Sequence, residues 1–420
     1  MATFANGETR LKMTQEALRQ TAMGACFLGS GGGGTLQSAL GLIENFRSGE
    51  YYSDDTVEVV KVEDATEGDA VVVAYIGAPA KINHAAYPDG PVQAAVQVSS
   101  RLRELGRRLA YIVPAETGAL GFTVACLVAA KLRLKVVDAD GAGRAVPSLP
   151  QLTFSITEGL SPNPAIVVNQ DKNLCVTVNA SILPDVADCV QHKPGQQFPA
   201  ARIEDLSRII DNLMRPIISE PAFDQFGGLA LWIMTPEQMR KALRIRNTLW
   251  KAWALGAGLP GFASSDDLLE YLKEKLRITA HRLFGPAQLT NAEINTEGGF
   301  DVGKVDFTDN DRICTVQYQN ESLIAGLKKY DDPLCTAPDS IAYFLEPSET
   351  GSNEPKVFSN GDLLSEDGSL REDLKGRMFS VIGIAVDDVL WEQDAGIFTT
   401  FRDLLRKMGY HGEPVSIIPR

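Results

Sequence analysis

Apolar and polar positions in the first third of the chain predict strands and helices in alternation. Residues 70–76 (AVVVAYI) and 109–113 are apolar throughout, as in strands that are covered on both faces. Residues 91–105 and the alanine-rich residues 122–132 have the pattern of helices, and residues 134–137 that of a further strand. Strands that alternate with helices are typical of a mostly parallel sheet with helices on its faces.

A run of four glycines precedes this pattern and lies between two predicted helices. Thr14 is a suitable N-cap for a helix that begins at Gln15, and a second helix follows from Leu36. The backbone amides of Gly31, Gly32, Gly33 and Gly34 could therefore hold a carboxylate or an oxyanion, with help from the helix dipole. The alternative is a flexible turn that permits tight packing. No Walker motif and no convincing dinucleotide fingerprint is present, so we expect no nucleotide cofactor.

The pattern changes from about residue 150, where prolines become frequent. Pairs of short apolar segments around residues 171–173 and 298–299 predict hairpins, and helices are expected only near 236–255 and 265–276. We therefore predict two domains. An α/β domain with a mostly parallel sheet would span residues 1–165, and a β-rich, barrel-like domain with helical insertions would span residues 166–420.

Composition narrows the partners and the compartment. The 420-residue chain has a net charge of −14, which disfavours nucleic acid and anionic membrane surfaces as partners. No apolar run reaches the length of a membrane span, and the polar N-terminus lacks the apolar segment of a signal peptide. The six cysteines are scattered without metal-finger spacing. These features predict a cytoplasmic protein with reduced thiols, and a homo-oligomer remains open.

The ends of the predicted parallel strands carry the candidate chemistry. Ligands of open parallel sheets bind beyond the carboxyl ends of the strands, and three such ends are found here. The polar side chains that follow them are Lys81, Asn83, His84, Glu116, Asp138, Asp140 and Arg144. Because these ends meet on one rim, we expect a small-molecule site there. The segment 136–144 (VVDADGAGR) is the most informative, since its two carboxylates share one side of an extended chain.

Two questions stay open at this point. Asp138 and Asp140 could instead belong to a turn in which their carboxylates bind local amides. Of the four histidines, His84 is best placed to act as a base or a metal ligand, and with Asp140 it could hold a divalent metal ion such as zinc. The chain has no HxH or HExxH spacing that would support a metal independently.

Several blocks of sequence, in order along the chain, resemble the S-methyl thiohydantoin desulfurase family, long catalogued near hydantoinase and oxoprolinase genes. The resemblance spans roughly residues 15 to 415 and rests on GACFLGSGGGG, YIGAPAKINH, CLVAAKLRLKVVDADGAGRAVPSLPQLTF, YQNESLIA and CTAPDSIAYF. The motif positions that it carries over are the glycine loop, Gly77-Ala78-Pro79, Glu116, 138–144, Asn320-Glu321 and Asp339. The chain departs from the family at three places. His84-Ala85 stands where a Glu-Lys pair is expected, and ETGA (residues 116–119) replaces an EIGG-type block. Ser148 replaces an acidic residue.

The resemblance implies an enzyme that replaces sulfur by oxygen on a thiohydantoin-type ring and releases sulfide or a thiol. In this scheme Asp140 or His84 activates water, directly or through a divalent ion, with Glu116 and Asp138 beside them. The amides of residues 31–34 or Arg144 hold an anionic group, and Asn320, Glu321 and Asp339 bind substrate from the second domain. The alternatives are a cyclic-amide hydrolase of hydantoin or oxoproline type and a non-catalytic subunit of a hydantoinase-like complex.

Overall fold

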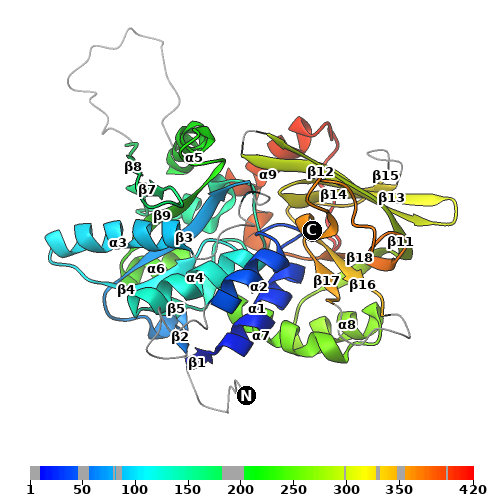
Figure 1. The fold of residues 1–420 in the computed structure, drawn as a ribbon, viewed down its shortest axis with the longest axis horizontal. Coiled ribbons are helices and arrows are strands. Elements are labelled where there is room, and N and C mark those ends of the chain that lie inside the picture. Colours follow the sequence, from blue (N-terminus) through cyan, green and yellow to red (C-terminus); the bar gives the residue numbers. More distant parts are fainter. Residues whose placement is uncertain are drawn as a thin grey trace, which may run out of the picture.

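The computed structural model describes residues 10–45, 56–78, 81, 88–181, 203–297, 299–327, 332–347, 355–393 and 396–420. Two eight-stranded sheets lie side by side, one in an α/β half and the other in a β-rich half (Figure 1). Within these residues, no helix is both long enough and apolar enough to cross a membrane.

The first sheet has the parallel centre that the sequence predicts. Its strand order is β1-β2-β5-β4-β3-β9-β7-β8, and neighbours among β2, β5, β4 and β3 run parallel, whereas β1, β9, β7 and β8 pair antiparallel. The strands are β1 (Arg10–Met13), β2 (Val57–Val60), β3 (Asp69–Gly77), β4 (Leu109–Pro114), β5 (Lys135–Val137), β7 (Ala165–Val168), β8 (Cys175–Val178) and β9 (Phe226–Met234).

Helices cover both faces of this sheet. Val71 and Val73 of β3 pack into one apolar cluster, and Ala70 and Val72 pack into the other, so the apolar strand is buried on both sides. The helices on the first face are α1 (Gln15–Leu28), α2 (Leu36–Asn45), α3 (Asp89–Glu104) and α4 (Ala119–Leu132). Helix α7 (Thr248–Gly258) packs on α1, and α8 (Ser265–Tyr271, continued by a π turn at Leu272–Leu276) packs beside the second sheet. The helices on the second face are α5 (Ile203–Ser219), α6 (Pro236–Ala242) and α9 (Gly396–Lys407).

Two glycines let α1 and α7 approach each other closely. A Cβ atom on Gly24 would lie 1.9 Å from the carbonyl oxygen of Ala252, and one on Gly256 would lie 1.7 Å from that of Gln20. Any larger residue at either position would push the helices apart. Segments more than 200 residues apart in the sequence thus form one packed layer beside the first sheet.

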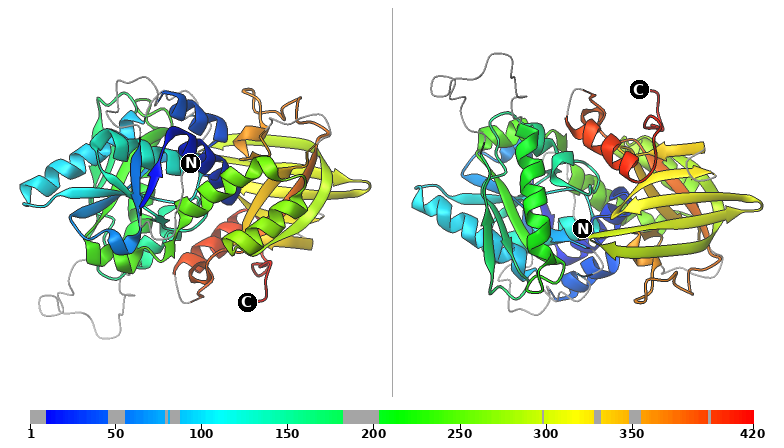
Figure 2. Two further views of the ribbon diagram at one scale, coloured as in Figure 1. Left: turned by 90° about the horizontal axis from the view of Figure 1, so that it is seen from below. Right: turned by 90° about the horizontal axis from the view of Figure 1, so that it is seen from above.

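The second sheet is antiparallel throughout, in the order β15-β14-β13-β12-β11-β18-β16-β17. Its strands are β11 (Ala280–Glu297), β12 (Phe300–Asp309), β13 (Arg312–Gln319), β14 (Glu321–Leu327), β15 (Asp332–Thr336), β16 (Ser340–Leu345), β17 (Val357–Phe358) and β18 (Met378–Ile384). The expected barrel-like closure is not found, because β15 and β17 at the two edges do not pair in the described part of the chain. The curved sheet instead has the α/β half at one end (Figure 2).

The first sheet continues past residue 165, where the sequence predicts a domain boundary. Strands β7 and β9 pair with each other, and β9 pairs with β3, so the proline-rich exit loops out and returns to the same sheet. A small ladder between β6 (Ala139–Asp140) and β10 (Ile245–Arg246) also joins the two parts. The short 3₁₀ helices are Val62–Asp64, Leu149–Gln151, Thr153–Ile156, Leu259–Gly261, Gly361–Leu363 and Asp388–Leu390.

The glycine loop lies where the two halves meet. The backbone amide of Ser322 donates to the carbonyl oxygen of Ser30 at 2.7 Å, and the amide of Asn360 donates to that of Gly31 at 2.7 Å. On the other side of the interface, α9 packs against the 3₁₀ helix Leu149–Gln151 (Figure 1). Residues of the β-rich half therefore reach the carboxyl ends of the parallel strands.

Candidate active site

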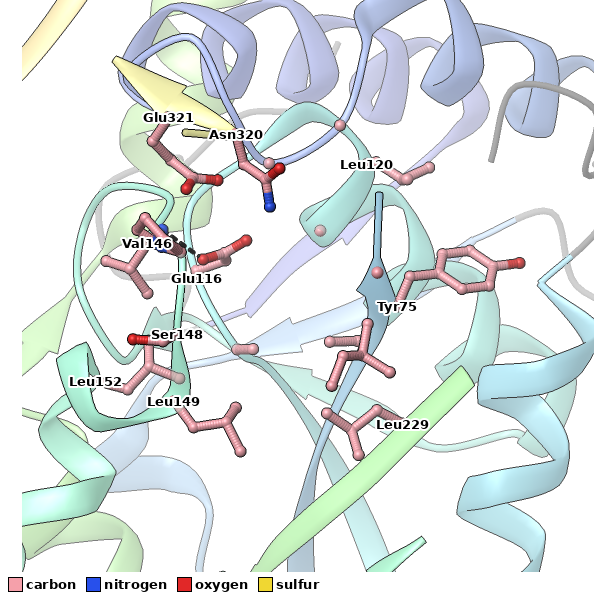
Figure 3. A pocket seen from close by; sticks show the side chains of 18 of the residues that line it. Tyr75, Glu116, Leu120, Val146, Ser148, Leu149, Leu152, Leu229, Asn320 and Glu321 are labelled. Atoms are coloured by element: carbon pink, nitrogen blue, oxygen red, sulfur yellow. Dashed lines mark hydrogen bonds between the residues drawn. The ribbon is translucent and has the colours of Figure 1, made fainter. Parts of the chain in front are cut away.

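A pocket with about 820 Å³ of empty space, its open mouth included, lies between the two halves at this meeting point. Its wall combines apolar side chains with a few polar ones, and Figure 3 shows Glu116, Asn320 and Glu321 projecting into the same space. The lining residues used below are Gly33, Gly34, Tyr75, Glu116, Leu120, Val146, Ser148, Leu149, Leu152, Asp211, Arg215, Asn320 and Glu321.

Glu116 is contributed by the α/β half. It follows β4, in the turn that leads into α4, and so stands at the carboxyl end of a parallel strand, as the sequence predicts. One oxygen, Oε2, accepts a hydrogen bond of 2.6 Å from the backbone amide of Val146 (Figure 3). The chain that follows the 138–144 segment thus fixes the direction of this carboxyl group.

Glu321 is contributed by the β-rich half. It is the first residue of β14, and only 2% of its surface is exposed. Its carboxylate accepts a hydrogen bond from the amide of Gly33, whereas the oxygen Oε2 is buried and has no partner. A Cβ atom on Gly32 would lie 2.4 Å from Oε1, so glycine at this position leaves the space that the carboxyl group occupies.

The pKa values of both carboxyl groups are raised. Burial is the largest cause in both, and the charge of Glu321 further raises the pKa of Glu116, well above its usual range. The pKa of Glu321 is raised to about 8, although the Arg144 charge and the Gly33 amide oppose the rise. Two carboxyl groups that share a desolvated site do not both ionise near neutral pH. The pair therefore retains a proton at pH 7, and a proton donor stands beside a proton acceptor once Glu321 ionises, near its pKa of about 8.

Asn320 stands directly before Glu321 and also lines the pocket. Its backbone has a left-handed conformation with φ of 57°. Successive side chains of an extended strand point to opposite faces. The left-handed turn at Asn320 allows residues 320 and 321 to project into one pocket, as Figure 3 shows.

Three further residues of the wall, Asp211, Arg215 and Tyr75, were not identified from the sequence, whereas Ser148 was named as a departure from the family motif. Asp211 and Arg215 of α5 form an ion pair with an N–O distance of 3.1 Å, and Arg215 also donates to the carbonyl oxygen of Pro147. Burial raises the pKa of Asp211. Tyr75 lies at the end of β3, and Ser148 follows Pro147. The spacing of Asp211 and Arg215 on one helical face was the available signal, but no helix was predicted there.

The glycine loop does bind carboxylates, but they belong to the protein itself. Asp362 accepts hydrogen bonds from the amides of Leu36 and Gln37, at 2.9 and 3.1 Å, and so caps the N-terminus of α2. Gly33 donates to Glu321. Gly33 and Gly34 line the pocket, whereas Gly31 and Gly32 face the β-rich half, against Asn360 and Glu321 respectively. The helix dipole and the first amides of α2 are thus already used within the fold.

The carboxylate of Asp140 binds local amides, as in the turn interpretation, whereas that of Asp138 binds amides from a distant part of the chain. Asp138 accepts from the amides of Leu249 and Trp250 at the start of α7, and burial raises its pKa to about 6. Asp140 is fully buried and accepts from the Thr117 hydroxyl and from the amides of Ala142 and Gly143. Neither residue is part of the pocket wall.

Arg144 and Asp339 also lie outside the pocket wall. The fully buried guanidinium of Arg144 uses its five N–H groups on four backbone carbonyl oxygens and one hydroxyl, which belong to Ala145, Pro338, Asp339, Ser322 and Ser30. Burial lowers its pKa to about 10. The carboxylate of Asp339 accepts from Val386, Trp391, Ser416 and Ile417 and so ties down the C-terminal segment. No donor of Arg144 is left for a substrate anion.

The suggested metal ligands do not form a cluster in the described residues. His84 lies outside those residues, and Asp140 is already bound to three donors. Groups of three or more His, Cys, Asp or Glu side chains suited to a metal ion do not occur within the described ranges. The carboxylate of Asp140 is already occupied by these donors and does not fit a metal ligand. No step of the chemistry proposed for this site therefore uses a metal.

Comparison with known proteins places the chain in a family. The models of the S-Me-THD-like N-terminal and C-terminal domains match residues 16–179 and 205–400. An X-ray crystal structure of a protein from Chromobacterium violaceum is 43% identical, with a TM-score of 0.83, and the match covers 97% of this chain and 100% of that one. None of the curated proteins compared with the chain matches it. The chain thus belongs to the S-Me-THD-like family, which confirms the resemblance that its sequence motifs indicate.

Proposed function

We propose that this protein is an enzyme that hydrolytically removes sulfur from a thiohydantoin-type ring, with Glu116 and Glu321 as its acid–base pair. The family supports the kind of substrate. The observation that carries the proposal is the pair of buried carboxyl groups with raised pKa values in one interdomain pocket. Neighbouring carboxyl groups that hold one proton between them are well suited to general acid–base catalysis.

In the first step, water adds to the ring carbon that carries sulfur. The ionised carboxylate of the pair takes a proton from the water while the new carbon–oxygen bond forms. The electron pair of the broken π bond moves to the thione sulfur or, in an S-alkyl substrate, to the ring nitrogen. The protonated carboxyl group then donates its proton to that atom. Both charges that develop in this step are thereby neutralised within the pair.

In the second step, the carbon–sulfur bond breaks. The carboxylate that has just donated its proton removes the proton of the new hydroxyl group, and a carbonyl forms. The departing sulfur takes a proton from the other carboxyl group and leaves as sulfide or as a thiol. The pair returns to its initial singly protonated state, so water is the only co-reactant.

The rest of the pocket suits a small planar ring. Leu120, Leu149 and Leu152 supply apolar surface. Figure 3 shows Leu149 and Leu152 on the same side of the pocket as the two acids and Leu120 on the opposite side. Apolar walls exclude water from the charged groups and strengthen their interactions with the substrate. Only a few polar groups are then needed to orient the ring.

The test is an assay on three ring compounds: a 2-thiohydantoin, its S-methyl derivative and the sulfur-free hydantoin. We expect release of sulfide or methanethiol and formation of an intact hydantoin ring from the first two, and no change in the third. A ring-opened product from the hydantoin would instead indicate a cyclic-amide hydrolase. If the purified chain is inactive on all three compounds, the proposal fails and the role of a non-catalytic subunit gains support.

A metal-assisted form of the same reaction remains a second route, with His84 as the residue that motivates it. Elemental analysis of the purified protein and of its H84A variant addresses it directly. Two results would assign the activation of water to a metal ion and not to the Glu116–Glu321 pair. The wild-type protein would contain stoichiometric metal that the H84A variant lacks, and a chelator would remove activity that the same metal restores.

A further inference from the structure

We infer that the side-chain amide of Asn320 donates a hydrogen bond to the atom of the substrate ring that gains negative charge when water adds. This inference rests on the proposed function and assigns the group that stabilises the addition step. Three features of Asn320 support this role: its backbone is held in place, the nitrogen end of its side-chain amide faces the pocket, and that nitrogen lies near the two carboxyl groups.

The backbone of Asn320 is fixed from two sides. Its amide donates to the carbonyl oxygen of Asp301 at 2.7 Å, and its own carbonyl oxygen accepts from the side-chain amide of Asn360 at 3.0 Å. Asparagine tolerates the left-handed conformation better than most residues. The position of the side chain is thus set before any ligand binds.

The orientation of the side-chain amide is determined by Asp301. Its backbone N–H donates to Oδ1 of Asn320 at 2.8 Å. Because an N–H group can only donate, the atom that faces it must be the oxygen, and an inverted amide would set two donors against each other. Nδ2 is therefore the end that reaches into the pocket, as Figure 3 shows. It makes no hydrogen bond within the described residues, so its two hydrogens remain available.

The surroundings of Nδ2 indicate its target. Figure 3 shows it beside the carboxyl groups of Glu116 and Glu321, facing the space where the reacting carbon must lie if those groups transfer the protons. Among the other polar side chains of the wall, Arg215 donates through Nη2 to Asp211 and Pro147, and Ser148 binds Gln151. The buried Nε of Arg215 has no partner within the described residues. A donor held at the reacting carbon, in a largely apolar pocket, stabilises developing negative charge without reorganisation.

The test compares three variants of the full-length protein. N320D keeps an acceptor for the Asp301 amide and tolerates the left-handed backbone, but it removes the donor. N320G keeps the backbone and removes the side chain without adding a charge. N310G is the matched control, since Asn310 also has positive φ, of 51°, in an exposed turn between β12 and β13.

We expect kcat to fall roughly 100- to 1,000-fold in both N320D and N320G, with a much smaller change in KM. The reduction should persist at the pH optimum of each variant, which separates the lost donor from the charge that N320D adds. N310G should behave as wild type. Circular dichroism and the unfolding temperature of N320D should match wild type, because its bond to Asp301 remains.

Two results would overturn the inference. One is an N320D enzyme with wild-type kcat, which would reduce Asn320 to a structural residue. The other is a change confined to KM, which would mean that the amide binds the ring without favouring the addition step. Both results presuppose that the wild-type protein releases sulfide or thiol. If the wild-type protein released neither product, that result would count against the proposed function, and the wild-type assay would show it independently of the variants.

Discussion

Glu116 and Glu321 lie 205 positions apart in the sequence and belong to different halves of the molecule, yet both line one pocket, where the charge of Glu321 raises the pKa of Glu116. The first follows a parallel strand, and the second begins an antiparallel one. Their meeting in one pocket is the central feature of the candidate site.

Replacing either carboxyl group by the isosteric amide should abolish most of the activity. We expect E116Q and E321Q each to lower kcat by about 100- to 10,000-fold, since neither amide can take or give the proton. Sulfide or thiol release under saturating substrate is the measurement. E237Q is the control, because Glu237 lies on the surface and pairs only with Lys241. An E116Q enzyme as fast as E237Q would exclude Glu116 from the chemistry.

The activity should depend on pH through the shared proton. Turnover requires one ionised and one protonated carboxyl group, so it should rise as Glu321 ionises, with a midpoint near its raised pKa of about 8. It should fall at higher pH, as Glu116, whose pKa the Glu321 charge raises further, loses the last proton of the pair. Removing the charge of Glu321 lowers the pKa of Glu116. The residual activity of E321Q should therefore lose its alkaline limb at a lower pH than wild type. A pH–rate profile for both proteins decides this, and identical alkaline limbs would contradict the coupling.

A single methyl group on the glycine loop should disturb the pair. In G32A the new Cβ would lie 2.4 to 2.7 Å from the side chain of Glu321, so that the carboxyl group must move. A displacement of about 1 Å from a productive position can cost roughly 100-fold in rate. G41A in α2 is the control, since nothing lies within 4 Å of its Cβ position. We expect low kcat in G32A and wild-type kcat in G41A, both measured alongside thermal unfolding.

Asp140 should prove to be a structural residue. D140A leaves the hydroxyl of Thr117 and two buried amides without their acceptor, which should lower the free energy of unfolding by about 2 kcal/mol or more. Folded D140A should keep kcat within a few-fold of wild type. Urea unfolding and the desulfurisation assay on one preparation test both parts. Lost turnover with unchanged stability would return Asp140 to the active site.

Arg144 should contribute more to stability than a typical surface arginine. R144M removes five buried hydrogen bonds, three of them to the β-rich half, and each orphaned acceptor costs roughly 1 to 3 kcal/mol, so we expect a loss above about 3 kcal/mol. R406M, at an exposed position of α9, should stay within about 0.5 kcal/mol. Comparable unfolding midpoints for the two variants would show that the buried network contributes little.

Much of the fold could be predicted because its signals are local. Thr14 caps α1 through the amide of Ala17, the apolar strands β3 and β4 lie at the centre of the first sheet, and the two hairpins form around the predicted turns. Helices α5 and α9 were missed. The sequence after residue 165 was interpreted as β-rich, and α5 contains a proline at position 216, which weakens its helical signal.

The candidate site was only partly predictable, for a physical reason. Glu116 could be found because it follows a buried strand, whereas Asp138, Asp140 and Arg144 share that location and serve the fold instead. A polar residue after a strand looks the same in sequence whether it binds a ligand or a backbone amide. The partner of Glu116 comes from the distant β14 strand, and only the family motif pointed to it.

The buried guanidinium of Arg144 also bears on how the molecule can be taken apart. The family models divide the chain between residues 179 and 205, yet Arg144 of the first part binds carbonyl oxygens of the second. Expressed alone, the first part would carry a stranded cation and the second a set of bare carbonyls. The two parts are therefore not independent modules that evolution or a cloning experiment can exchange freely, and compatible halves must be inherited together.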